Sequence, residues 1–319
     1  MSAAESSDLV IRTLQEPDLP AADRIFRLAF GTFLRLPNPM GFFGDADLIR
    51  TRWLADPSAA FGAFLDDKLV GSNIVTNWGS VGFFGPLTVH PELWDRGIGR
   101  RLLEPAMDLF TKWSTTHEGL FTFAHSPKHI ALYRKFGFLP RFLTAVMSKA
   151  VGSVRAGVEF SKFSDVSAND RAGCLKACRE LTGEIYPGLD LQREIVAVEA
   201  QLLGDTIFVC DNTHLVGLAV CHRGPGTEAG SGVCYVKFAA VRPGPAEHEL
   251  FGRLLDSCEA LAASKQLARL VAGVNTAREK AYLAMIERGF GTDIQGVAMQ
   301  RFSHPGYNRS DVYIVDDWR

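Results

Sequence analysis

The chain has 319 residues, of which 47% are hydrophobic and 22% charged, and its formal net charge is −2. This length and composition predict a globular protein of two domains of about 150 residues each. The charge argues against nucleic acid as a partner, no apolar run is long enough to span a membrane, and the first residues lack the basic start and apolar core of a signal peptide. We therefore expect a cytoplasmic protein.

Hydrophobic alternation and helical spacing predict the elements of the first half. Strands are predicted at 9–14, 60–65, 69–76, 81–89, 120–124 and 142–148, and helices at 22–33, 45–54, 97–114 and 128–136. Asp45 is the predicted N-cap of the second helix. The order β-α-α-β-β-β-α-β-α-β indicates a mixed α/β (α+β) fold, a mixed sheet flanked by helices, and neither a Rossmann alternation nor a barrel.

A similar series of elements follows residues 151–157. Strands are predicted at 158–163, 206–210, 215–221, 233–241, 268–275, 295–302 and 312–315, and helices at 168–185, 191–203, 247–262 and 277–287.

The two halves also match in sequence at a fixed offset of 152 positions. The matches are Val89-His-Pro91 with Val241-Arg-Pro243, Arg101-Leu-Leu103 with Arg253-Leu-Leu255, and Gly137-Phe138 with Gly289-Phe290. Several matches in one register indicate the duplication of a whole domain, because solenoid repeats are much shorter. We predict two tandem domains, at residues 1–150 and 151–319.

All six cysteines lie in the second half, and none belongs to a C-x-x-C pair. The spacing of zinc ligands is therefore missing, and a disulfide framework is not expected in a chain of this size. Cys174 and Cys178 are one helical turn apart, which is typical of a buried helix face. We expect no metal site.

Residues 87–103 are the predicted centre of the chemistry. A strand ends at Val89 and a helix opens at Gly97, where the glycines at 97 and 99 let the backbone approach a ligand closely. Unpaired amides and the helix dipole at such an N-terminus favour an anion such as a pyrophosphate. The predicted donors are the amides of Arg96, Gly97, Ile98, Gly99 and Arg100.

Taken alone, this R-G-x-G motif is equally typical of an ordinary strand-to-helix turn. It is not a P-loop, because no Gly-Lys-Ser/Thr follows, and it is not the dinucleotide fingerprint, because Leu102 stands where a third glycine or alanine belongs.

Together with the order of the elements, two blocks of residues carry a resemblance to the GNAT superfamily of N-acetyltransferases. The first block is Leu87-x-Val89-x-Pro91 with Arg96-Gly-Ile-Gly99, and the second is Leu132-Tyr133-Arg-Lys-Phe-Gly137-Phe138. The resemblance covers residues 9–150, and the second half shares the order of elements. The protein therefore resembles a tandem GNAT protein, with two acyl-CoA N-acyltransferase-like domains.

The resemblance implies that acetyl-CoA binds in a cleft where two parallel strands splay apart, here those ending near Val89 and Ala124. It implies that the backbone of Leu87, Thr88 and Val89 pairs with the pantetheine arm, that residues 96–100 hold the pyrophosphate, and that Tyr133 protonates the departing thiolate. A phenol is a reasonable acid there because its pKa lies above that of a thiol.

Some positions depart from the family pattern. Trp94 replaces the common Gln or Arg, which should not disturb a cradle made of backbone groups, and Ser126 replaces a common Asn, although its hydroxyl could still bind the pantetheine. In the second half, the offset places Glu249, Phe251 and Met285 at the positions of Gly97, Gly99 and Tyr133. The second domain is therefore expected to have lost cofactor binding and catalysis.

We expect the first domain to move an acetyl group from acetyl-CoA to a primary amine by direct attack, with the Val89 amide polarising the thioester oxygen. The alternative is a non-catalytic acyl-CoA-binding or regulatory protein. His90 and His125 are either general bases or local turn residues, and Phe30, Phe33, Phe42, Phe43 and Trp78 either line the acceptor pocket or belong to the core. A small-molecule amine or a peptide remains open as the acceptor.

Overall fold

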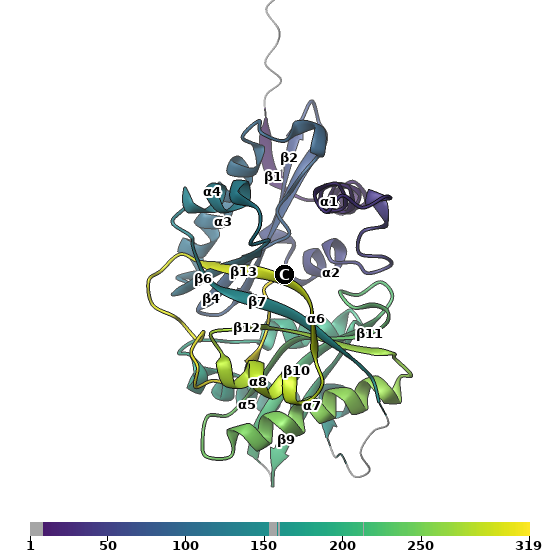
Figure 1. Cartoon of the computed structure of the whole chain (residues 1–319), viewed down its shortest axis with the longest axis vertical. Helices are drawn as coiled ribbons and strands as arrows, with labels where there is room; N and C mark the ends of the chain where they lie inside the picture. The colour runs from purple at the N-terminus through teal and green to yellow at the C-terminus, as the bar shows by residue number, and fades with distance from the viewer. Residues whose placement is uncertain (1–8, 153–157, 159, 213) are drawn as a thin grey trace, which may run out of the picture.

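The computed structural model describes residues 9–152, 158, 160–212 and 214–319. The first half forms the upper part of the molecule in Figure 1, the second half forms the lower part, and one sheet continues through both. The fold class predicted from the sequence, two tandem halves each with a mixed sheet flanked by helices, is confirmed.

The first half contains the elements β1 (Val10–Thr13), α1 (Leu19–Phe33), α2 (Ile49–Ala55), β2 (Ala60–Leu65), β3 (Lys68–Trp78), β4 (Val81–Phe84), β5 (Thr88–Val89), α3 (Ile98–Trp113), β6 (His117–Thr122), α4 (Pro127–Arg134) and β7 (Leu139–Ala150). Strands β1 to β4 are antiparallel neighbours, and β4 runs parallel to β6. The order of the predicted elements is therefore correct, except that one predicted strand is divided into β4 and β5.

The second half contains β8 (Ser161–Lys162), α5 (Arg171–Ile185), α6 (Gln192–Ala200), β9 (Gly204–Asp211), β10 (His214–Gly224), β11 (Gly230–Val241), α7 (Glu247–Ser264), β12 (Arg269–Asn275), α8 (Glu279–Glu287), β13 (Gly291–Gln300) and β14 (Ile314–Val315). The strand predicted at 158–163 is reduced to β8, and its residue Glu159 lies outside the described residues, as do residues 153–157 of the predicted connection.

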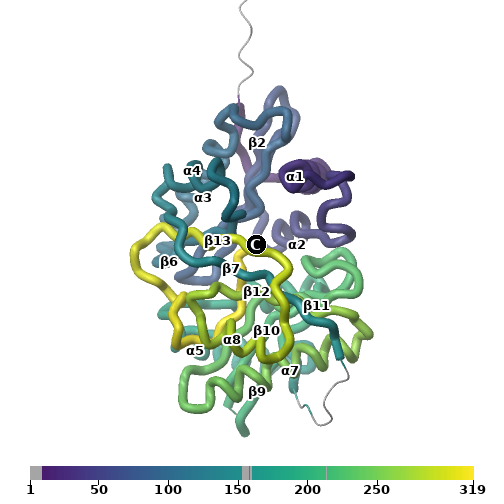
Figure 2. Tube along the Cα trace, viewed as in Figure 1, coloured from purple at the N-terminus to yellow at the C-terminus, as the bar shows by residue number. Residues whose placement is uncertain are grey.

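The two halves exchange strands where they meet. β13, from the second half, lies between β6 and β7, with Val297 opposite Thr122 and Gln295 opposite Ala145. β7, from the first half, pairs on its other side with β12. Figure 2 shows the yellow C-terminal part of the chain crossing the middle of the molecule beside teal β6 and β7. The sheet therefore continues across the boundary that the sequence predicts near residue 150.

The apolar faces of the helices cover the sheet. In α3, Ile98, Leu102, Ala106 and Phe110 recur at helical spacing, are buried, and face β2, β3 and β4. In α7, buried residues face β9, β10 and β11 in the same way. Cys178 is buried on α5 as predicted, and all six cysteines are free.

The predicted N-cap of the second helix is wrong. α2 begins at Ile49, and the carboxylate of Asp47 accepts from the Arg50 amide at 2.9 Å, so it does the capping. Asp45 lies earlier in the loop, and its carboxylate accepts from the amide of Ser231 at 2.8 Å and from the Ser231 hydroxyl. These bonds hold the pKa of Asp45 below its ordinary value. Asp45 therefore fastens the two halves together.

Candidate functional site

The sheet breaks between β4 and β5, where the sequence predicted one continuous strand. Val75 is opposite Phe84 in the pairing of β3 with β4, but Gly71 is opposite Val89 in the pairing of β3 with β5, so one extra residue is accommodated between them. Gly85 has a φ of +148°, and Pro86 has no N–H to donate to a ladder. As a result, β4 pairs with β6, while β5 pairs with β3 alone among the described strands.

The break turns backbone groups toward the space between β5 and β6. The His90 amide donates to the Val70 carbonyl at 2.8 Å. In an antiparallel pair with this register, Val89 and Leu87 are the residues whose N–H and C=O groups point away from β3. The edge at which the sequence predicts donor binding thus has backbone groups that point away from β3, and their direction follows from the register of β3 and β5.

Two side chains beside this edge have local partners. The Trp94 indole N–H donates to the Val89 carbonyl at 2.8 Å, which leaves the Val89 amide as the free donor. The Thr88 hydroxyl is buried and lies 3.1 Å from that of Ser72, and the backbone groups of Thr88 face β3, so neither is directed to the free side of the edge. Trp94, which replaces a polar residue of the family pattern, therefore supports the edge through a hydrogen bond of its own.

The turn predicted to bind an anion begins α3, with one correction. Gly97 is the N-cap with a φ of +79°, and the Arg100 amide, predicted to be free, donates to the Gly97 carbonyl at 3.1 Å. Across the part of the chain that the structure describes, no acceptor is bonded to the amides of Arg96, Gly97, Ile98 or Gly99. The cradle therefore has four free amides rather than five.

The two glycines of the turn have different reasons to be there. A Cβ at Gly97 would meet nothing within 4 Å, but the positive φ is one that residues with a Cβ rarely adopt. Gly99 has no positive φ, and a Cβ there would lie 3.4 Å from Leu132, an ordinary contact. The turn itself therefore requires the backbone conformation of Gly97, whereas position 99 has no such requirement.

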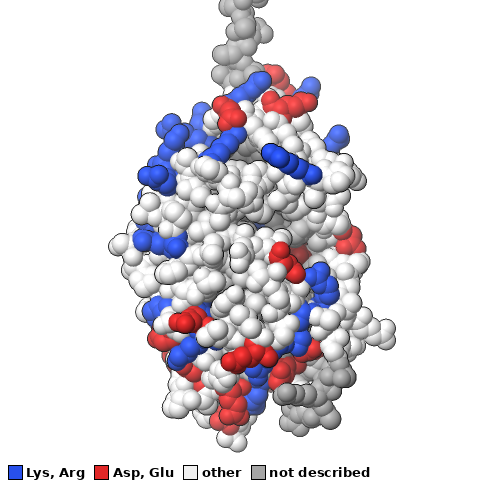
Figure 3. Space-filling view, viewed as in Figure 1, with Lys and Arg blue, Asp and Glu red and all other residues white. Residues whose placement is uncertain are grey.

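Exposed cations surround the turn. Arg96 and Arg100 are exposed at its start, and Lys128 forms a 2.7 Å ion pair with Asp95. Arg101 is 3.2 Å from Glu104 and is therefore partly neutralised. Figure 3 shows Lys and Arg side chains gathered over the region of α3 and α4. The free amides and these cations fit the phosphates of a coenzyme.

Tyr133 lies in the core, on α4. It is 7% exposed, and its ring packs against Phe84 at 5.7 Å. Burial raises the pKa of the phenol well above its ordinary value, and the side chain of Thr122, the last residue of β6, opposes this rise only in part. The phenol is therefore protonated at neutral pH and can donate a hydrogen bond.

Ser126 is only 4% exposed and caps α4, because its hydroxyl accepts from the His129 amide at 3.4 Å. The predicted bond to a pantetheine would need the remaining O–H of this hydroxyl. The capping role follows from the sequence Ser-Pro at a helix start.

The aromatic residues weighed for an acceptor pocket fall into two groups. Trp78 is a core residue, 1% exposed, and Phe30 and Phe42 stack at 5.3 Å to anchor the loop after α1. Phe33 instead contacts the residues that follow β6, with ring centroids 5.2 Å from Phe123 and 5.6 Å from His125. The half-buried ring of Phe33 therefore lies at the end of β6.

The equivalent cleft of the second half is filled by the chain itself. β11 pairs with β12 up to Val236, as β4 pairs with β6, and β14 then lies along β11 with Ile314 opposite Ala240. The amide of Val241, the counterpart of Val89, donates to the Tyr313 carbonyl at 3.3 Å. α7 also begins at Glu247, so its first turn covers the position of the free amides of the first half. The sequence predicts a strand at 312–315 but does not predict that this strand pairs with β11.

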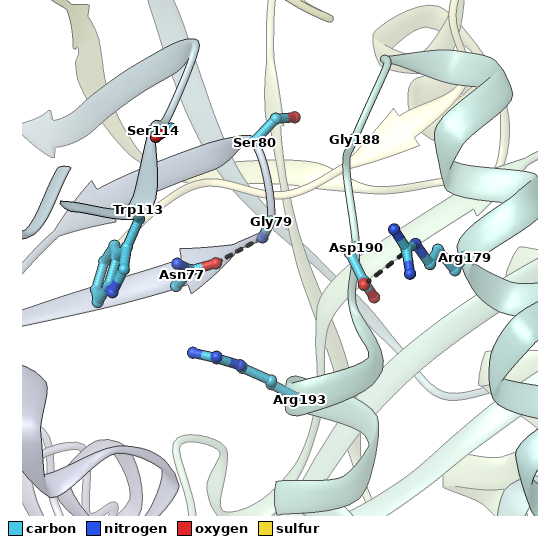
Figure 4. Close-up of a pocket in the computed structure, with 9 residues that line it drawn as sticks. All are labelled: Asn77, Gly79, Ser80, Trp113, Ser114, Arg179, Gly188, Asp190 and Arg193. Carbon is cyan, nitrogen blue, oxygen red and sulfur yellow. Dashed lines mark hydrogen bonds and ion pairs between the residues drawn. The ribbon is translucent and has the colours of Figure 1, made fainter. Parts of the chain in front are cut away.

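A separate cavity lies between the two halves at the opposite end of β4. It has a volume of about 450 Å³ and is lined by Asn77, Gly79, Ser80, Trp113, Ser114, Arg179, Gly188, Asp190 and Arg193. In Figure 4, Arg193 points toward Asn77 and Trp113, while Arg179 pairs with Asp190 at 3.6 Å. None of the predicted donor-binding residues lines this cavity.

Within residues 9–152, 158, 160–212 and 214–319, no group of three or more His, Cys, Asp or Glu side chains is arranged to hold a metal ion. None of the helices in these ranges is long and apolar enough to cross a membrane.

Known proteins share the sequence pattern of the first half and the fold of the whole. The sequence profile of the acetyltransferase (GNAT) family matches residues 24–138, and no curated protein sequence matches the chain. A candidate acetyltransferase from Pyrococcus horikoshii superposes with a TM-score of 0.67 at 15% identity, over 98% of this chain and 95% of that one.

Two further solved structures are similar over almost the full length of both chains. For a GCN5-related N-acetyltransferase from Sphaerobacter thermophilus the TM-score is 0.56 at 15% identity, covering 93% of this chain and 96% of that one. For a tandem GNAT protein from the clavulanic acid biosynthesis pathway it is 0.55 at 14% identity, covering 92% and 98%. At such identities the likeness establishes the fold. Residues 24–138 therefore match the GNAT acetyltransferase family, and the chain as a whole has the tandem GNAT fold.

Proposed function

We propose that the first domain transfers an acetyl group from acetyl-CoA to a primary amine. The observation that carries this proposal is the contrast between two equivalent positions in the sheet. Among the described residues, no strand pairs with β5 on the side away from β3, whereas β14 fills the matching position beside β11. The second half thus illustrates how an extended ligand would bind in the first half. In the second half, the Tyr313 carbonyl accepts from the amide of Val241, which is the counterpart of Val89.

The residues of the first half fit an acyl-CoA. The backbone of Leu87 and Val89 would pair with the amide groups of the pantetheine, as β11 pairs with β14. The amides of residues 96–99 and the nearby arginines would hold the pyrophosphate. Acetyl-CoA supplies a thioester carbonyl, which an uncharged amine can attack.

The chain contributes to this reaction through two hydrogen-bond donors. The Val89 amide donates to the carbonyl oxygen as negative charge develops there, in the manner of an oxyanion hole. The Tyr133 hydroxyl donates to the sulfur as the C–S bond breaks and the new C–N bond forms. The amine proton leaves to solvent or to His125, which lies at the end of β6.

Tyr133→Phe tests this mechanism. We expect kcat to fall about 100-fold, the lower end of the usual contribution of a positioned acid, with little change in the KM for acetyl-CoA. Thiol release from acetyl-CoA with a panel of amines measures both constants. Because Phe33 and Phe123 lie at the end of β6, amines with apolar or aromatic groups should be preferred to polyamines. Tyr282→Phe, in the second half, is the matched control, and unchanged turnover in Tyr133→Phe would remove Tyr133 from the mechanism.

The pH profile provides a further check on Tyr133. The rate should rise with pH as the amine loses its proton. It should not fall up to a pH of about 10, the ordinary pKa of a phenol, because burial raises the pKa of Tyr133 above that value. A loss of activity below this pH that is absent in Tyr133→Phe would contradict the assignment.

Acetyl-CoA should bind at one site per chain, because β14 occupies the second cleft and the first turn of α7 covers its anion position. Isothermal titration calorimetry measures this stoichiometry directly. A second site of comparable affinity would contradict the proposed loss of binding in the second domain. Binding without turnover of any amine would favour the non-catalytic acyl-CoA-binding alternative.

A further inference from the structure

A buried chain of charged side chains connects the break between β4 and β5 to the second half. Arg52, on α2, donates from Nη1 to the Gly85 carbonyl at 2.8 Å and from Nε and Nη2 to both carboxylate oxygens of Glu228 at 3.1 and 2.8 Å. Lys237 Nζ lies 2.7 Å from Glu228 and 2.7 Å from Glu194. Arg52, Glu228, Lys237 and Glu194 are all buried. A fixed guanidinium therefore holds the first carbonyl after β4.

The chain of charges is balanced and fastened at both ends. Glu194 accepts from the indole N–H of Trp78, the last residue of β3, at 3.2 Å. Burial alone would raise the pKa of Glu228, but Arg52 and Lys237 outweigh it and hold this pKa well below its ordinary value. Both carboxylates are therefore ionised and match the two cations. Arg52 also donates to the backbone oxygen of Arg319.

The network joins two equivalent points of the duplicated fold. Lys237 is the counterpart of Gly85 at the offset of 152 positions. The pairing of β10 with β11 jumps from Val220 and Phe238 to Cys221 and Val236, so Lys237 is itself the extra residue of a bulge. The bulge of the second half thus supplies Lys237, which helps to hold the Glu228 carboxylate that Arg52 binds.

The amide of Gly85 already donates to the Ile74 carbonyl at 2.8 Å, so its carbonyl is the group left for a partner outside the sheet. Gly85 has no side chain, its φ of +148° is one that only glycine adopts readily, and Pro86 has no N–H. The Gly85 carbonyl is therefore the group through which a side chain can hold the turn that leads into Leu87 and Val89.

We propose that Arg52 is a positioning residue for the acetyl-CoA edge. By holding the Gly85 carbonyl against Glu228, it sets the direction in which Leu87 and Val89 present their backbone groups to the pantetheine and the thioester. The second domain thereby takes part in donor binding without touching the donor. This inference rests on the proposed function, because it concerns the same edge.

The test compares variants of Arg52 with a matched variant of another buried arginine. Arg52→Lys keeps the charge beside Glu228 but loses the planar fork. The double variant Arg52→Met with Glu228→Leu removes one charge of each sign and leaves Lys237 paired with Glu194, so the full chain should fold. Arg278→Lys is the control, because Arg278 is equally buried but binds Asp316 and Asn308, away from Gly85.

We expect both Arg52 variants to raise the Kd for acetyl-CoA about tenfold, as misplaced hydrogen bonds would, and to lower kcat, with the KM for the amine unchanged. Arg278→Lys should retain the wild-type Kd. Hydrogen–deuterium exchange of residues 85–90, which needs no ligand, should speed up in Arg52→Lys and not in Arg278→Lys.

The outcomes separate the two proposals. Wild-type Kd and wild-type exchange in the folded Arg52 variants would overturn the role of Arg52. Faster exchange at residues 85–90 in a protein whose wild type does not bind acetyl-CoA would leave the role of Arg52 in shaping the edge intact and overturn the proposed function. Equal effects in Arg278→Lys would mean that Arg52 acts only through the overall stability of the fold. That result would also overturn its positioning role.

Discussion

Gly97→Glu is expected to weaken acetyl-CoA binding about 100-fold or more. The substitution places a carboxylate among the free amides of residues 96–99, where the pyrophosphate would bind, and imposes a φ of +79° on a residue with a Cβ. The second half already carries Glu249 at the equivalent position, on a helix that has extended over the site. Calorimetric titration with acetyl-CoA at low salt measures the loss.

Gly97→Asn is the matched control for this experiment. Asparagine tolerates the left-handed conformation better than other residues with a Cβ and brings no charge, so it should cost about tenfold or less in affinity. Wild-type affinity in Gly97→Glu would mean that the anion site lies elsewhere, whichever function the protein has.

Trp318→Ala is expected to lower the free energy of unfolding by about 3–5 kcal/mol, the usual cost of truncating a buried tryptophan. Trp318 is 4% exposed, its indole N–H donates to the Tyr307 hydroxyl at 2.8 Å, and its ring stacks on Phe83 of the first half. It also lies against Gly119, where a Cβ would come within 2.3 Å of the indole. The tail is therefore part of the core of both halves.

Urea denaturation followed by tryptophan fluorescence and circular dichroism measures this effect. Because strands β7 and β13 are exchanged, the variant should still unfold in one transition. Trp113→Ala is the control, since Trp113 is half-buried at the cavity between the halves and should cost much less. Two separate transitions, or an equal loss in both variants, would contradict the role assigned to Trp318.

The sequence predicts most of the elements, the duplication and the family, because these depend on local hydrophobic patterns and on residues that match at one offset. It does not predict the break in the strand at 81–89, although Gly85-Pro86 is the signal that was available. Because apolar residues stand on both sides of this dipeptide, the hydrophobic pattern predicts one continuous strand.

The strand exchange and the place of the tail could not be predicted for a different reason. Because the halves are duplicates, β7 and β13 have the same alternation and the same matched residues, such as Met147 and Met299, so either pairing satisfies the local pattern. Likewise, the four apolar residues at 312–315 indicate a buried strand but not which edge they cover. Arg52 is one arginine among many, and only the folded chain brings it to Gly85 and Glu228.

The exchange of β13 has a consequence for how the protein is made. Thr122, at the end of the strand that carries the Tyr133 contact, pairs with Val297, which the ribosome adds long after the first half has emerged. Until then β6 is without that neighbour, and its unpaired edge is open to non-native pairing. The sheet of the first half therefore cannot close until β13 has been made, so the edge proposed to bind acetyl-CoA is completed only after most of the second half has been synthesised.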